Sequence, residues 1–244
     1  MKAYRDETYG QRIARIYDDL YEKVDEDALD VLAELADGGR VLELGIGTGR
    51  VALPLRARGV DVYGIDASEE MIARMRAKPG GEDIPVTGGN FVNMDVDGPF
   101  NLIYVLFNTF FALLTQDDQV RCFQNVAQRL GPEGVFLIEA FVPDLRRFDR
   151  GQTVRATGVD VDEVHLESSR YDPLTQQVTS QHVILTEEGV RLFPVKLRFA
   201  WPAELDLMAR LAGLNLGYRW EDWRRAPFTA KSEKHISVYR RGAA

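Results

Sequence analysis

The sequence predicts an α/β fold in which helices cover both faces of a mostly parallel sheet. Helix and strand signals alternate over the first 140 residues, as in successive β-α-β units. The segments 101–107 and 135–141 are almost wholly apolar, which is typical of strands with both faces covered. From about residue 152 the apolar period becomes two, which indicates that antiparallel strands interrupt this pattern.

Four strands and four helices are predicted before the interruption. The strands are 41–44, 60–65, 101–107 and 135–141. The helices are 28–36, 48–58, 68–78 and 117–130, with N-caps at Asp25 or Asp27, at Ser68 and at Asp117. Pro54 lies inside the second helix and predicts a kink there.

Alternating side chains predict three or four antiparallel strands between residues 152 and 201, among them 178–186 and 193–201. A turn at Glu187-Glu188-Gly189 separates these two. Pro202 then opens a helix that ends at Gly213, and strands over 215–220 and 234–240 follow.

Composition excludes several classes of protein. The chain has 244 residues, 30 of them basic and 38 acidic, for a net charge of −8, which disfavours nucleic-acid binding. Its longest strongly apolar run, 102–107, is too short to span a bilayer. The single cysteine, Cys122, cannot form an internal disulfide. We therefore expect a cytoplasmic protein with a small-molecule partner, no nucleic-acid or membrane partner, and possible homo-oligomers.

A glycine-rich turn carries the strongest functional signal. Glu43-Leu44-Gly45-Ile46-Gly47-Thr48-Gly49 joins a predicted strand to a helix, and Asp66 ends the next strand. Glycines allow a tight turn and close approach of a ligand to the backbone, while a carboxylate after the second strand can bind both ribose hydroxyls. This pattern predicts an adenosine-containing cofactor at the carboxyl edge of the sheet. The alternative is that the glycines only shape a turn and Asp66 caps a helix.

Glu43 and Arg50 discriminate between cofactors. A dinucleotide turn favours a small residue where this chain has Arg50. A carboxylate beside a pyrophosphate would also cost about 4 kcal/mol, for two charges ~4 Å apart at an effective dielectric of ~20. Glu43 suits the ammonium and sulfonium of S-adenosylmethionine instead. A nicotinamide dehydrogenase is therefore disfavoured.

Residues 43–49 resemble the first motif of class I S-adenosylmethionine-dependent methyltransferases, and the likeness extends over nearly the whole chain. It implies a Rossmann-like, seven-stranded sheet whose last strand is antiparallel, and a small antiparallel β insertion that roofs the acceptor pocket. The implied division is an N-terminal helical lid at 1–37, a cofactor-binding core at 38–150 and 202–244, and the insertion at 151–201.

The resemblance also implies roles for individual residues. The backbone of Gly45, Gly47 and Gly49 would hold the methionine part of the cofactor, Glu43 its ammonium and Asp66 its ribose. Further cofactor contacts are expected from Ala67, Met71, Asn90, Phe91, Phe107 and Tyr17. The family's usual acid near the adenine is Asn90 here, whose amide oxygen can still accept a hydrogen bond.

The N-terminal segment is rich in tyrosine, with Tyr4, Tyr9, Tyr17 and Tyr21. It resembles the lid of small-molecule N-methyltransferases that act on amino sugars and lincosamide-type antibiotics. Tyr9 and Tyr17 are predicted as catalytic residues, and Tyr9 also as an acceptor contact, because phenols and ring faces suit a cationic centre. The alternative is that these rings form the packed face of an amphipathic helix.

Further acceptor-side candidates follow the fourth strand and lie in the insertion. Asn108 and His182 are predicted as catalytic, and Phe110, Phe111, His165 and Arg198 as substrate contacts. The alternatives are that the phenylalanines are core residues and that the histidines and Arg198 are ordinary strand residues. No metal ligand set is expected.

The sequence therefore predicts a methyltransferase that transfers a methyl group from S-adenosylmethionine, leaving S-adenosylhomocysteine, to a small secondary metabolite. The absence of a strong general base favours an amine as the acceptor. Methylation of an oxygen is the alternative within this class. A non-catalytic protein that binds an adenosine ligand is the alternative outside it.

Overall fold

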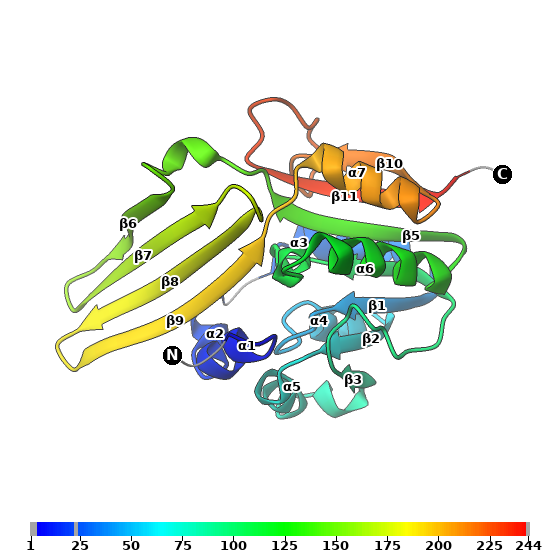
Figure 1. Ribbon diagram of the computed structural model, residues 1–244. Helices are drawn as coiled ribbons and strands as arrows, with labels where there is room; N and C mark the ends of the chain where they lie inside the picture. Colours follow the sequence, from blue (N-terminus) through cyan, green and yellow to red (C-terminus); the bar gives the residue numbers. More distant parts are fainter. Residues whose placement is uncertain (1–3, 22–23, 243–244) are drawn as a thin grey trace.

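A computed structural model describes residues 4–21 and 24–242 and contains two sheets (Figure 1). The larger has seven strands in the order β10-β11-β5-β4-β1-β2-β3, and the smaller has four in the order β6-β7-β8-β9. In the larger sheet, β1 to β5 run parallel to one another, while β11 runs antiparallel to both β5 and β10. The predicted fold class is confirmed.

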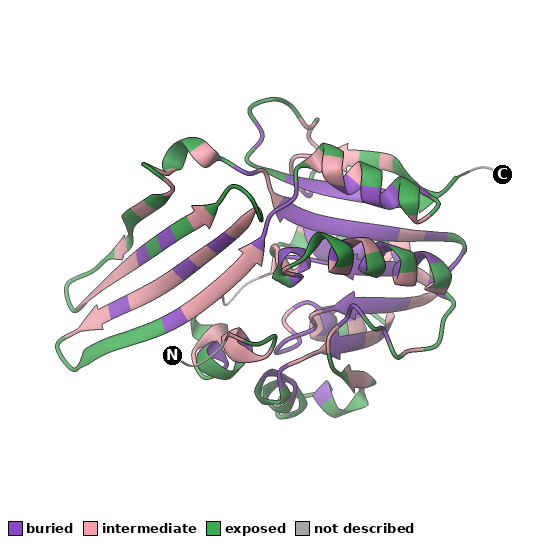
Figure 2. Cartoon of the chain, viewed as in Figure 1, coloured by how far each residue is buried: buried purple, intermediate pink, exposed green. Residues whose placement is uncertain are grey.

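The seven-stranded sheet is built from β1 (Arg40–Leu44), β2 (Asp61–Asp66), β3 (Val86–Gly88), β4 (Phe100–Val105), β5 (Leu130–Phe141), β10 (Leu214–Trp220) and β11 (Lys234–Arg241). Its central strands are buried along nearly their whole length (Figure 2), which explains their near-continuous apolar sequences. The strand β3 was not predicted, because its three residues are too few to show a pattern of apolar side chains.

Helices cover both faces of this sheet. The principal ones are α3 (Glu26–Ala36), α4 (Ala52–Ala57), α5 (Glu69–Arg76), α6 (Gln116–Arg129) and α7 (Pro202–Leu211). Phe123 of α6 and Leu205 of α7 belong to one hydrophobic core, whereas Leu32 of α3 and Leu55 of α4 belong to another. The two cores lie on opposite faces, as the alternating pattern predicts.

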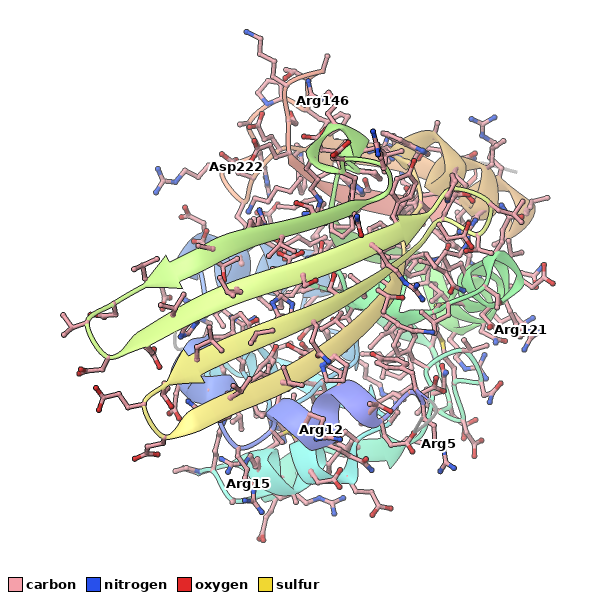
Figure 3. All side chains as sticks on the ribbon, turned by 60° about the vertical axis from the view of Figure 1, so that its left-hand side comes forward. Arg5, Arg12, Arg15, Arg121, Arg146 and Asp222 are labelled. Atoms are coloured by element: carbon pink, nitrogen blue, oxygen red, sulfur yellow. The ribbon has the colours of Figure 1, made fainter. Side chains whose placement is uncertain are left out.

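The insertion forms a four-stranded antiparallel sheet from β6 (Gln152–Val159), β7 (Glu163–Asp172), β8 (Gln177–Thr186) and β9 (Gly189–Arg198). Two short N-terminal helices, α1 (Thr8–Ile13) and α2 (Tyr17–Leu20), lie between this sheet and α5 (Figure 3). Ile13 packs with Phe193 of β9 and Met71 of α5. Gly10 permits the close approach, because a Cβ there would lie 2.5 Å from the Cβ of Ser68.

Several predicted boundaries are wrong for identifiable reasons. The N-terminal helix is not continuous, because Ile16 leaves the helical region at φ −121° and ψ 3°. Thr115, not Asp117, caps α6 by accepting a hydrogen bond from the backbone N–H of Asp118. The helix also ends at Arg129, before Gly131, because β5 begins at Leu130.

Pro54 produces no kink, since α4 begins at Ala52 and not at Thr48. The proline therefore lies in the first turn, where a backbone N–H has no partner within the helix. By contrast, Asp25 and Ser68 cap their helices as predicted. Among residues 4–21 and 24–242 we find no helix long and apolar enough to cross a membrane, and no metal-binding group of three or more His, Cys, Asp or Glu.

Candidate active site

The glycine loop lies at the carboxyl end of β1, where the strand order reverses between β1 and β4. Open α/β sheets bind ligands at such a switch point. Gly45, Gly47 and Gly49 all have positive φ, a backbone conformation that residues other than glycine rarely adopt. At Gly45 a Cβ would also lie 2.5 Å from the methyl carbon of Thr109. The backbone of this loop therefore carries no side chain at these three positions, which leaves it accessible to a ligand.

Asp66 ends β2 beside this loop. Its Oδ2 accepts a hydrogen bond from the backbone N–H of Gly47 at 2.7 Å, and its Oδ1 accepts one from Ser68 at 2.8 Å. Burial raises the pKa of Asp66, although these N–H groups oppose the shift. A carboxylate has about four acceptor positions, so Asp66 can order the loop and still accept bonds from ribose hydroxyls.

Glu43 is the second carboxylate of the loop region. It is buried on β1, and the hydroxyl of Tyr104 donates to its Oε2 at 2.9 Å. Burial raises the pKa of Glu43 to about 8, against the opposing effects of Tyr104 and Arg50. A buried carboxylate with this pKa gains its charge most readily when a cation binds next to it.

Arg50 lines a cavity beside the glycine loop and was not predicted as a site residue. Its guanidinium carbon lies 3.8 Å from the ring centre of Phe107, with the rings of Tyr21 and Tyr17 at 5.5 and 5.8 Å. Its buried Nε has no hydrogen-bond partner among the described residues. Its position directly after Gly49 was the available signal, which disfavoured a dinucleotide but did not indicate a role in the site.

A cleft of about 910 Å³ opens beside the loop. Aromatic residues line part of it, namely Tyr9, Tyr17, Tyr21, Phe107 and Phe141. Charged residues come from the end of β5, the start of β11 and the segment between β10 and β11, and these are Glu139, Glu221, Asp222, Lys231, Glu233 and Lys234. Figure 3 shows Asp222 on that segment, beyond one edge of the four-stranded sheet.

A smaller cavity of about 20 Å³ lies deeper, between Glu43, Gly45, Tyr17, Arg50 and Phe107. That volume holds about one water molecule. Tyr17, Arg50, Phe107 and Thr109 line both spaces. The cofactor loop and the cleft are therefore adjacent parts of one site.

Comparison with known proteins agrees with this arrangement. The methyltransferase domain family matches residues 41–134. The solved structure of the CcbJ methyltransferase from Streptomyces caelestis is 40% identical, with a TM-score of 0.91 over 98% of this chain and 100% of that one. The chain belongs to the class I S-adenosylmethionine-dependent methyltransferase family.

Two further relatives of this methyltransferase carry descriptive names. The cypemycin N-terminal methyltransferase of a Streptomyces species is 27% identical over 208 residues, 84% of each chain. The dTDP-4-amino-2,3,4,6-tetradeoxy-D-glucose N,N-dimethyltransferase of Saccharopolyspora spinosa is 29% identical over 168 residues, 67% of this chain and 65% of its own. The family predicted from the sequence is confirmed, and with it the family's cofactor, S-adenosylmethionine.

The site of this methyltransferase fits that cofactor. Glu43 offers a buried carboxylate for the ammonium, and Arg50 offers a cation with a free donor for the carboxylate of the methionine part. The glycine loop leaves room that a Cβ would fill. Met71 would border the adenine, and its methyl carbon lies 3.5 Å from the Cβ position at Gly47.

The predicted adenine contacts at Asn90 and Phe91 are already engaged by the protein. The Asn90 amide nitrogen donates to Asp6 at 2.6 Å, and its oxygen accepts the backbone N–H of Val92 at 2.9 Å. Phe91 is buried in the core. Ala67 follows Asp66 at the end of β2, and its role stays a prediction.

The tyrosines predicted as catalytic line the cleft. Burial raises the pKa of Tyr9, and the nearby Tyr21 and Tyr17 raise it further. Burial also raises the pKa of Tyr17, although Arg50 opposes the shift. Both phenols therefore stay protonated near neutral pH, so they can donate hydrogen bonds but do not supply a strong base.

Asn108 and Phe107 also line the cleft, at the end of β4. Both have positive φ, and the Asn108 side-chain oxygen accepts the backbone N–H of Phe141 at 2.7 Å. Asn108 thus fixes the turn that presents Phe107. Phe110 and Phe111 are completely buried in the core, so the expected apolar wall of the cleft is Phe107 and Phe141 instead.

The residues that line the cleft include no described residue of the insertion, and the expectation that the insertion roofs the acceptor stays a prediction. Arg198 lies in a buried network with Glu204, Gln119 and Gln176 at 2.5–3.0 Å. We propose a structural role for it, because the bonds to Gln119 of α6 and Glu204 of α7 join β9 to the core, and the bond to Gln176 holds the turn between β7 and β8. His165 bonds to Glu163 on its own strand, and His182 faces Glu167 and Phe193 across neighbouring strands.

Proposed function

We propose that this methyltransferase transfers a methyl group to the amine nitrogen of a small secondary metabolite, such as an amino sugar or antibiotic intermediate. The observation that carries the proposal is the cleft beside the cofactor loop, whose lining combines five aromatic rings with four carboxylates and three cationic side chains. Aromatic faces and carboxylates both attract cations. The names of the two relatives above, both of amine methyltransferases, support the same acceptor.

The cofactor supplies an electrophilic methyl group. The chain's own residues bind and orient the reactants: Glu43 and Arg50 hold the charged ends of the cofactor, and Asp66 holds its ribose. Tyr9, Tyr17 and Phe107 exclude water from the reacting centre and present ring faces to the acceptor. Catalysis then comes mainly from bringing the two reactants together in a water-poor cleft.

The proposal is tested in two stages. Calorimetric titration with S-adenosylhomocysteine, with NAD in parallel, first establishes that the purified chain binds the expected cofactor product. Transfer of a labelled methyl group is then measured for D-glucosamine and for an alanine tripeptide amide. D-glucose and the N-acetylated peptide serve as controls that lack the amine. Methylation of an amine at its nitrogen supports the proposal.

Oxygen methylation is the second candidate, because several phenols and carboxylates in the cleft can also bind hydroxyls. Label appearing equally in D-glucose and D-glucosamine would favour it. Binding of S-adenosylhomocysteine without transfer to any acceptor would instead favour a protein that only binds the adenosine ligand.

A further inference from the structure

Glu139 is a buried carboxylate that faces the cleft with few partners. It lies near the carboxyl end of β5, and its side chain is 9% exposed. Its Oε2 accepts a hydrogen bond from the backbone N–H of Phe107 at 3.3 Å, and its Oε1 lies 3.6 Å from Nζ of Lys234. Both contacts are longer than the ~2.7–2.9 Å of charge-assisted bonds. The carboxylate therefore keeps free acceptor positions on the cleft side.

Glu139 also lies beside the boundary between the cleft and the cofactor cavity. Phe107, which bonds to its carboxylate, lines both spaces. The backbone N–H of Asn108 donates to the carbonyl oxygen of Glu139 at 3.3 Å, and Asn108 bonds to Phe141 on the same strand. These bonds hold the Phe107 turn against the end of β5, where the cleft and the cofactor cavity meet.

The other carboxylates of the cleft have different surroundings. Glu221 accepts a hydrogen bond from the hydroxyl of Ser232 at 2.8 Å. Asp222 accepts two backbone N–H groups of its own loop at 3.0 Å, from Arg224 and Ala226. Glu233 is exposed. Glu139 is therefore the carboxylate of the cleft that combines burial, weak pairing and contact with the Phe107 turn.

We propose that Glu139 holds the protonated amine of the acceptor and takes its proton. The inference rests on the proposed function. The ammonium gives a proton to the carboxylate, and the freed lone pair on nitrogen attacks the methyl carbon. The carbon–sulfur bond breaks and its electron pair stays on sulfur, which becomes a neutral thioether. The positively charged, methylated amine leaves, and Glu139 releases its proton to water.

The substitution Glu139→Gln tests this role. Glutamine keeps the volume and an oxygen that can accept the N–H of Phe107, but it removes the charge and the proton acceptor. We expect kcat/KM for the amine acceptor to fall by about 10²–10⁴-fold, the usual contribution of proton transfer. Affinity for S-adenosylhomocysteine should change by less than about tenfold, since one ordinary hydrogen bond is worth no more than that order.

Glu133→Gln is the matched control, because Glu133 lies exposed on the same strand, β5. It should leave both quantities unchanged. If Glu139→Gln methylates the amine as fast as the parent, or loses cofactor binding together with activity, the inference is wrong while the proposed function stands. If the parent binds S-adenosylhomocysteine but methylates only hydroxyl acceptors, the proposed function fails at the acceptor, and this inference fails with it.

Discussion

The cofactor half and the acceptor half of the site are assembled in opposite ways. Glu43, the glycine loop and Asp66 come from one continuous stretch, residues 43–66, and Asp66 holds this stretch through the backbone N–H groups of Gly47 and Ser68. The cleft draws its walls from Tyr9, the end of β4, the end of β5 and the segment 221–234. The first half is local in sequence, and the second depends on the complete fold.

The two halves also differ in the amino-acid substitutions that they can tolerate. The glycine loop can accept few substitutions, because positive φ and the close packing at Gly45 exclude residues other than glycine. The cleft is built from side chains on separate loops, which can change one at a time without disturbing the sheet. The residues of the cleft therefore share no motif.

The largest expected effect tests the structural role of Arg198, which lies in the insertion. Arg198→Met breaks the buried pair with Glu204, whose side chains are 5% and 17% exposed. Removing one partner of such a pair costs about 3–5 kcal/mol of unfolding free energy. Denaturant unfolding should show this loss, with little change in affinity for S-adenosylhomocysteine. Arg191→Met, at an exposed site of the same strand, is the control, and equal stability of the two variants would refute the structural assignment.

The next effect is confined to the cofactor half. Asp66→Ala should weaken binding of S-adenosylhomocysteine by at least tenfold, because a hydrogen bond to a charged group is worth about 1.5–3 kcal/mol. Asp61→Ala changes the same residue type at the other end of β2 and should have little effect on binding. Calorimetry measures both variants, with their melting temperatures, because Asp66 also holds the N–H of Gly47. Unchanged affinity would remove Asp66 from the site.

The same contrast explains what the sequence could predict. The cofactor half could be predicted from the glycines, Glu43 and Asp66, because a strand, a turn and an acidic residue follow one another within residues 43–66. Glu139 and Lys234 looked like ordinary strand residues, and only the pairing of β5 with β11 brings them together. Arg198 and Phe110 are buried in the structure, which the sequence could not show, because periodicity does not tell a core position from a cleft position.

A smaller effect concerns the protonation of Glu43. Its pKa is raised by burial to about 8, so below that pH the free protein holds the proton and binding of a cationic ligand must release it. Affinity for S-adenosylhomocysteine should rise between pH 6 and 8, by at most tenfold per pH unit, and then level off. Glu43→Gln should bind more weakly and without this slope. A flat profile in the parent would show that Glu43 does not meet the ammonium.

The smallest effect tests the contact that joins the two halves. Asp18 of α2 accepts the hydroxyl of Thr48 at 2.6 Å and pairs with Lys78 at 2.8 Å, which fastens the N-terminal helices to the glycine loop. Burial alone would raise the pKa of Asp18, but Lys78 and Thr48 outweigh it and the pKa is lowered. The contact is therefore complete above the usual pKa of an aspartate and is lost as the pH falls through the lowered value.

Asp18→Asn should speed dissociation of S-adenosylhomocysteine by a few-fold, because the pair is partly exposed and partly exposed ion pairs are weak. Asp19→Asn, at the neighbouring exposed position, should leave the rate unchanged. Stopped-flow displacement measures both rates. Equal rates in both variants would mean that the N-terminal helices shape the acceptor wall through Tyr9 and Tyr17 without closing over the cofactor.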